Sequence, residues 1–73
     1  MRESRLLSSS TIKSVTYDFI EQKLFVEFIN GNIYKYEKIP QLAYANICTA
    51  PSPGKYIKHL STMYKGEKVS AID

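Results

Sequence analysis

The sequence contains almost none of the residues that build disulfide frameworks and metal centres. Among its 73 residues there is one cysteine, Cys48, and one histidine, His59. One cysteine cannot form an internal disulfide, and two side chains cannot complete a Cys/His metal cage. No nucleophile motif surrounds Cys48, so we interpret it as a core thiol and not as the catalytic partner of His59. We expect no metal and no other cofactor.

Long apolar runs are also missing. No run approaches the ~20 residues that a membrane-spanning helix needs. The first ten residues, MRESRLLSSS, have no apolar core long enough for a secretory signal. We therefore expect a cytoplasmic protein with no membrane partner. Paired-carboxylate and nucleophile–base motifs are lacking as well, so we do not expect an enzyme.

The size and charge of the chain are typical of one small globular domain. Apolar residues make up 44% of the 73 positions. A chain this short buries only about 60% of its unfolded surface, so association with a copy of itself or another partner would stabilise it. The net charge is +3: residues 1–34 carry four basic and four acidic side chains, and residues 35–73 carry six and three. The excess is therefore confined to the second half, where it is compatible with binding to a polyanion.

Alternating apolar residues predict three strands. The letters NGN that follow the second strand predict a hairpin, and the loop length decides which residues share a face. A two-residue turn would set Lys35 opposite Val26. A three-residue loop over 30–32 sets Tyr36 opposite Val26 and Lys35 opposite Glu27, which separates an apolar face from a mixed one. We prefer the three-residue loop, with its last asparagine in a left-handed conformation. The predicted strands are 12–18, 24–29 and 33–38.

Two short helices follow the strands. Pro40 suits a first helical turn, and the spacing of the apolar residues predicts a helix over about 40–49. The segment APSPG ends it, and Ser52 as N-cap with Pro53 at the first position begins a second helix. The expected fold is α+β, a three-stranded antiparallel meander with two short helices packed on one face (β-β-β-α-α). The expected organisation is a flexible arm at 1–9, a folded domain at 10–65 and a loose tail at 66–73.

Four segments follow one another along the chain: SSTIKSVTYD (9–18), LFVEF (24–28), GNIYKYEKIP (31–40) and APSPGKY (50–56). Taken in order, over about residues 9–64, they resemble the KTSC domain. The central YxY motif of that family corresponds to Tyr34 and Tyr36. The sequence departs from the family pattern at Thr16, where the family usually has glycine, and at Ser61, where the usual arginine would have been a good anion ligand.

The resemblance implies a small domain of unknown function. Such domains occur at the C-terminus of some lysyl-tRNA synthetases and alone in bacterial and phage proteins. The suggestion that they bind RNA rests on this association with a tRNA synthetase.

The Tyr34-Lys35-Tyr36 stretch has two interpretations. Exposed on an open sheet, the rings would stack on nucleic-acid bases. In the preferred register they share a face with the apolar residues of the second strand, and the helices should cover that face. We therefore favour core packing of both rings.

The start of the second helix, SPGKYIKH, is a candidate phosphate site. Free N–H groups and the helix dipole attract an anion, and a glycine lets it come close. The alternative is an ordinary capped helix with a solvated basic face. Lys35 and Lys38 would contribute only if they project to the same side. The candidate residues are Ser52, Gly54, Lys55, Lys58 and His59, with Lys35 and Lys38.

The other face of the sheet is a candidate interaction surface. In the preferred register Ile29 lies opposite Ile33, and Phe25 shares their face with charged residues. Such a face is either partly wet or docked on a partner, and a meander leaves two unpaired edges. Two functions thus remain open. The first is a non-catalytic module that binds RNA or nucleotide phosphates through the basic helix start, and the second is a protein-interaction or self-associating adaptor or inhibitor.

Overall fold

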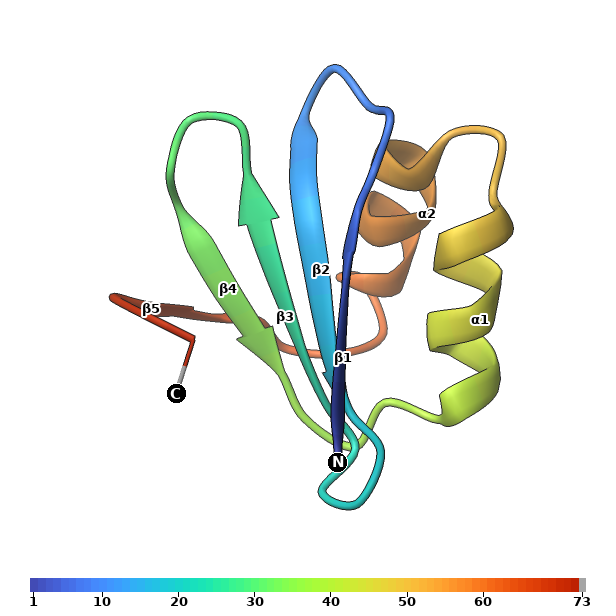
Figure 1. Cartoon of the computed structure of the whole chain (residues 1–73), viewed down its shortest axis with the longest axis vertical. Coiled ribbons are helices and arrows are strands. Elements are labelled where there is room, and N and C mark those ends of the chain that lie inside the picture. Colours follow the sequence, from blue (N-terminus) through green and yellow to red (C-terminus); the bar gives the residue numbers. More distant parts are fainter. Residues whose placement is uncertain (73) are drawn as a thin grey trace.

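The chain folds into a five-stranded antiparallel sheet with two helices on one side (Figure 1). A computed structural model of the chain describes residues 1–72. The α+β class and the two helices are as predicted, whereas the prediction of three strands is wrong. The elements are β1 (Arg2–Leu6), β2 (Ile12–Asp18), β3 (Lys23–Phe28), β4 (Ile33–Tyr36), α1 (Gln41–Thr49), α2 (Pro53–Leu60) and β5 (Glu67–Val69).

The two additional strands border the sheet. Its strand order is β1-β2-β3-β4-β5, so every strand pairs with its neighbours in the chain. β1 and β5 lie within the segments predicted as a loose arm and a loose tail, and the last residue of that tail, residue 73, lies outside the described residues. Both segments are polar and mostly exposed, because a border strand needs no buried apolar row.

The β3–β4 hairpin has a three-residue loop, but the loop is one residue earlier than predicted. The Phe28 N–H donates to the Asn32 carbonyl at 2.8 Å, and Gly31, with φ of 94°, takes the left-handed position. Glycine adopts that conformation without a steric penalty. Ile33 consequently lies opposite Glu27 and not opposite Ile29. The register differs from the predicted one by two positions, so each side chain keeps its predicted face.

The face under the helices forms the core. Tyr36 lies opposite Leu24 and is 4% exposed, and Tyr34 lies opposite Val26 and packs against the same cluster. Tyr36 is therefore a core residue and Tyr34 is partly buried against the core, so the two rings do not form an open stacking platform. Burial raises the pKa of Tyr36, and the neighbouring Tyr34 adds to this effect. α1 and α2 complete the core, which consists of Ile12, Val15, Tyr17, Leu24, Val26, Tyr36, Ile39, Tyr44, Ile47, Ile57 and Leu60.

The opposite face of the sheet offers less apolar surface than predicted. Phe25 is 0% exposed, and the Arg2 guanidinium lies over its ring at 5.2 Å from the centroid. Phe25 pairs with Thr16 on one side and Lys35 on the other. Ile29 is exposed but belongs to the hairpin loop, and Ile33 is half-buried. Phe25, Ile29 and Ile33 therefore do not form one continuous apolar patch.

Asp18 organises the turn between β2 and β3. One of its carboxylate oxygens accepts hydrogen bonds from the N–H groups of Ile20 at 3.0 Å and Glu21 at 2.9 Å. The other lies 3.5 Å from Arg2 Nε. The hydrogen bond from Glu21 is the main cause that lowers the pKa of Asp18, and Ile20 and Arg2 add to it. The charged carboxylate thus holds the tight turn.

Acid should destabilise the domain partly through Asp18. Its pKa is lower in the folded chain than in the unfolded one, so its contribution is present above the unfolded pKa and lost as the pH falls through the folded pKa. We expect the free energy of unfolding to fall between roughly pH 5 and pH 2, and to fall less steeply in Asp18→Asn. Urea unfolding across a pH series measures both slopes. An unchanged slope in Asp18→Asn would contradict the assignment.

Candidate functional site

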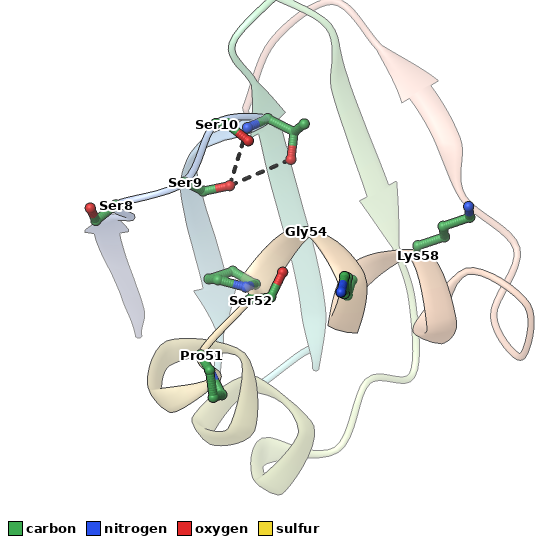
Figure 2. Close-up of a pocket in the computed structure, with 10 residues that line it drawn as sticks. Ser8, Ser9, Ser10, Pro51, Ser52, Gly54 and Lys58 are labelled. Carbon is green, nitrogen blue, oxygen red and sulfur yellow. Dashed lines mark hydrogen bonds between the residues drawn. The ribbon is translucent and has the colours of Figure 1, made fainter.

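A groove of about 500 Å³ lies where the β1–β2 loop meets the start of α2. Figure 2 shows the serine-rich loop, residues 8–11, on one side and the first turn of the helix on the other. Two distant segments of the chain thus form one site. The groove is lined by Ser8, Ser9, Ser10, Thr11, Pro51, Ser52, Pro53, Gly54, Lys55 and Lys58.

The first turn of α2 leaves hydrogen-bond donors for a ligand. Ser52 is the N-cap and Pro53 the first helical residue, both as predicted, but the Ser52 hydroxyl makes no capping hydrogen bond. Pro53 has no N–H, and the Tyr56 N–H donates to the Ser52 carbonyl at 3.2 Å. The N–H groups of Gly54 and Lys55 are the remaining first-turn donors, which have no partner inside a helix.

Gly54 brings the loop and the helix into close contact. A Cβ atom at this position would lie 2.7 Å from the Thr11 hydroxyl oxygen. The loop itself is held by Ser9, whose hydroxyl oxygen accepts the N–H groups of Thr11 and Ile12, each at 3.2 Å (Figure 2 shows the bonds between Ser9 and Thr11). The missing side chain of Gly54 therefore accommodates the Thr11 hydroxyl and lets the loop pack against the helix.

The positive charges of the groove have no acidic partner among the residues that the structure describes. Among residues 1–72, no carboxylate lies within ion-pair distance of Lys55 or Lys58, and both lysines are exposed. The first turn of α2 also has no acidic residue. A cation near a helix N-terminus opposes the helix dipole, so stability alone would favour the opposite charge there. Figure 2 shows Lys58 extending away from Ser9 and Ser10.

The other predicted site residues lie elsewhere. Lys35 is at 3.6 Å from a Glu37 carboxylate oxygen and 3.4 Å from one of Glu67. Lys38 is exposed in a left-handed conformation with φ of 60°, and it does not line the groove. His59 is exposed on α2 and does not line the groove either. The structure thus brings together four of the seven predicted anion-site residues: Ser52, Gly54, Lys55 and Lys58.

The residues of both groove walls lie within a match to a known protein family. The family model described as KTSC domain matches residues 8–60, more than half of the chain. The chain belongs to the KTSC domain family. The match begins at the serine-rich loop and includes all of α2, so it covers every residue that lines the groove, whereas β1 and β5 lie outside it.

Relatives of this KTSC domain occur within large enzymes and as small proteins. A lysine–tRNA ligase of Nostoc sp. is 37% identical over 62 residues, which are 84% of this chain and 11% of the ligase. The chain therefore spans about a tenth of such a relative. An uncharacterized protein of Stutzerimonas stutzeri is 35% identical over 54 residues, 74% of this chain and 76% of that protein. The crystal structure of a KTSC domain protein from Yersinia pestis superimposes with a TM-score of 0.84 at 27% identity, covering 94% of this chain and 99% of that one.

The described part of this KTSC domain has no cluster of metal-ligating side chains. No three His, Cys, Asp or Glu residues in 1–72 are grouped so as to hold a metal ion. No helix in the same range combines the length and apolar character that crossing a membrane requires. Cys48 is half-buried and packs against the core. The groove is therefore the strongest candidate site among the described residues.

Proposed function

We propose that this KTSC domain is a non-catalytic module that binds the phosphate groups of RNA in the groove between the serine-rich loop and α2. The observation that carries the proposal is the first turn of α2, which has Lys55, no acidic residue and no side-chain cap. Such a turn is disfavoured on its own and becomes favourable when an anion is bound. The Gly54 and Lys55 N–H groups and the loop hydroxyls supply donors, and Lys55 and Lys58 supply charge.

The relatives support RNA as the source of the phosphate. Three of them are lysine–tRNA ligases, proteins named for a reaction with tRNA. This chain corresponds to about a tenth of their length, so the proposal gives the KTSC segment a role in holding RNA and none in the ligase reaction. Because Tyr36 is buried and Tyr34 packs against the core, we expect binding to rest on backbone phosphates and to depend little on base sequence.

RNA binding should weaken steeply when salt is added. With two phosphates neutralised on a single strand, the slope of log K against log salt is about −1.4. We expect Lys55→Glu/Lys58→Glu to reduce the affinity for a short single-stranded RNA at least about tenfold at low salt. Fluorescence anisotropy with a labelled oligonucleotide measures both quantities.

The matched control is Lys65→Glu/Lys68→Glu, which changes the net charge equally at two exposed lysines outside the groove. This control should lower the affinity for RNA by about threefold at most, because it acts only through the long-range electrostatic field. An equal loss in both variants would show that only net charge matters. No measurable binding to RNA at about 50 mM salt would contradict the proposal itself.

Protein interaction through a sheet edge is the second candidate function. The specific observation in its favour is β1, a five-residue border strand with four exposed residues. Border strands present unpaired backbone groups that another chain can extend. The buried position of Phe25 argues against the sheet face as the docking surface and leaves the edge.

A further inference from the structure

The border strand β1 has a regular pattern of used and unused backbone groups. On the side of β2, the Leu7 N–H donates to the Lys13 carbonyl at 3.0 Å, and the Phe19 N–H donates to the Met1 carbonyl at 2.9 Å. In an antiparallel pair, every second residue exchanges hydrogen bonds with the partner strand. The odd-numbered positions of β1 therefore face β2, and the backbone groups of Ser4 and Leu6 point to the free edge.

The charges of β1 are complementary to themselves. The strand reads Arg2-Glu3-Ser4-Arg5-Leu6, with Glu3 and Arg5 placed symmetrically about Ser4. We propose that the free edge of β1 pairs with β1 of a second copy of this chain, antiparallel, with the twofold axis at Ser4. Glu3 then lies opposite Arg5 of the second copy, and Arg5 opposite its Glu3. The inference concerns the second candidate function and does not depend on RNA binding.

The hydrogen-bond pattern fits this register. Ser4 and Ser4 of the second copy exchange two hydrogen bonds on the axis, because their N–H and C=O groups point outward. Glu3 and Arg5 of the second copy then form a non-hydrogen-bonded pair, in which side chains approach most closely. Both ion pairs thus sit where cross-strand contact is strongest.

Neighbouring registers are unfavourable. A shift of two positions sets Glu3 opposite Glu3 or Arg5 opposite Arg5, which brings like charges together. A shift of one position places residues whose backbone groups point to the free edge opposite residues of the second copy whose backbone groups face its own β2. Such a pair cannot exchange hydrogen bonds. The strand therefore specifies one antiparallel register with itself.

Glu3 has room for a second cation. One oxygen accepts the Tyr44 hydroxyl at 3.0 Å, and the other pairs with Arg5 Nη2 of the same strand at 3.3 Å. A carboxylate has about four acceptor positions, so an arginine of the second copy can join without displacing Tyr44. Leu6, which is 82% exposed, also gains cover at this edge. The opposite border, β5, has only three residues, and pairing it with β1 would be a head-to-tail contact, which builds a ring or a filament instead of a twofold dimer.

Sedimentation equilibrium of the whole chain tests the pairing. Only a short strand is buried, so we expect a dissociation constant on the order of 100 μM, typical of a small interface. Arg5→Glu alone and Glu3→Arg alone should each weaken self-association about tenfold or more, because each replaces two opposite-charge pairs by like-charge pairs. Mixing the two variants should restore dimers, since the mixed pair again has opposite charges at both positions.

Two further observations decide the outcome. Ser4→Pro removes an N–H that the β1–β2 ladder does not use, so it should abolish dimers while circular dichroism retains the fold. In the wild-type dimer the Ser4 amide should exchange more slowly as concentration rises. A wild-type chain that remains monomeric at about 1 mM overturns the proposal. Dimers that survive both Ser4→Pro and Arg5→Glu overturn it as well, because they use another surface.

Discussion

Replacing Tyr17 by alanine is expected to lower the free energy of unfolding by about 3–5 kcal/mol. The ring is 0% exposed, stacks on Tyr44 with centroids 4.8 Å apart and meets the edge of Phe19 at 5.0 Å. The Tyr17 hydroxyl donates to the Ile39 carbonyl, which ties β2 to the segment leading into α1. At roughly 0.05–0.15 kcal/mol per residue the whole domain is stable by about 4–11 kcal/mol, so this change removes much of its stability.

Tyr17→Phe separates the contribution of the hydroxyl from that of the ring. It keeps both ring contacts and leaves the Ile39 carbonyl without its donor, at an expected cost of about 1–3 kcal/mol. Urea unfolding followed by circular dichroism measures both variants. Equal losses for phenylalanine and alanine would mean that the ring contacts contribute nothing. A loss below about 1 kcal/mol for alanine would contradict the central position of Tyr17 in the core.

Gly66→Ala is expected to lower the free energy of unfolding by about 1–3 kcal/mol through overpacking. A Cβ atom on Gly66 would lie 2.7 Å from Tyr36 Cε2 and 2.9 Å from its Cζ. The Tyr36 ring is 4% exposed inside the core and has no space into which to retreat. The strain therefore falls on the chain at Gly66, immediately before β5.

Amide hydrogen exchange locates the effect of this substitution. The β5 amides should lose protection in Gly66→Ala before those of β2 and β3, because β5 is a three-residue border strand. Lys65→Ala, at the exposed neighbouring position, is the matched control and should keep wild-type protection. Equal stability of Gly66→Ala and wild type would show that β5 accommodates the methyl group.

Periodicity in the sequence predicted the central strands and both helices, because their apolar residues recur at the spacing that places them on the face of the core. β1 and β5 were missed for a physical reason. Each pairs on one side only, and the residues of β1 have no apolar row that would predict a strand. The hairpin register was predicted two positions away because Gly31, and not Asn32, takes the left-handed position. A difference of two positions leaves each side chain on its predicted face of the sheet, because side chains alternate with a period of two.

Only one wall of the groove, the start of α2, could be predicted from the sequence. The basic first turn of α2 follows from SPGK, since a serine and a proline in that order predict a helix start. The serine-rich loop lies over forty residues earlier and reaches α2 only through the sheet and the core. Lys35 was excluded from the groove by long-range strand pairing, which sets it opposite Glu67. Such contacts have no counterpart in local sequence patterns.

The strand order has a consequence for how the domain forms. β1 to β4 follow one another in the sheet as in the chain, so each of their pairings closes a short loop. The pairing of β4 with β5 instead spans both helices, since its first pair joins Lys35 to Glu67, and closing this longer loop costs more chain entropy. We therefore expect the first four strands to assemble quickly and β5 to dock last, after α1 and α2 have covered the sheet. The docking of β5 then depends on Gly66 fitting against the Tyr36 ring, which is already packed in the core.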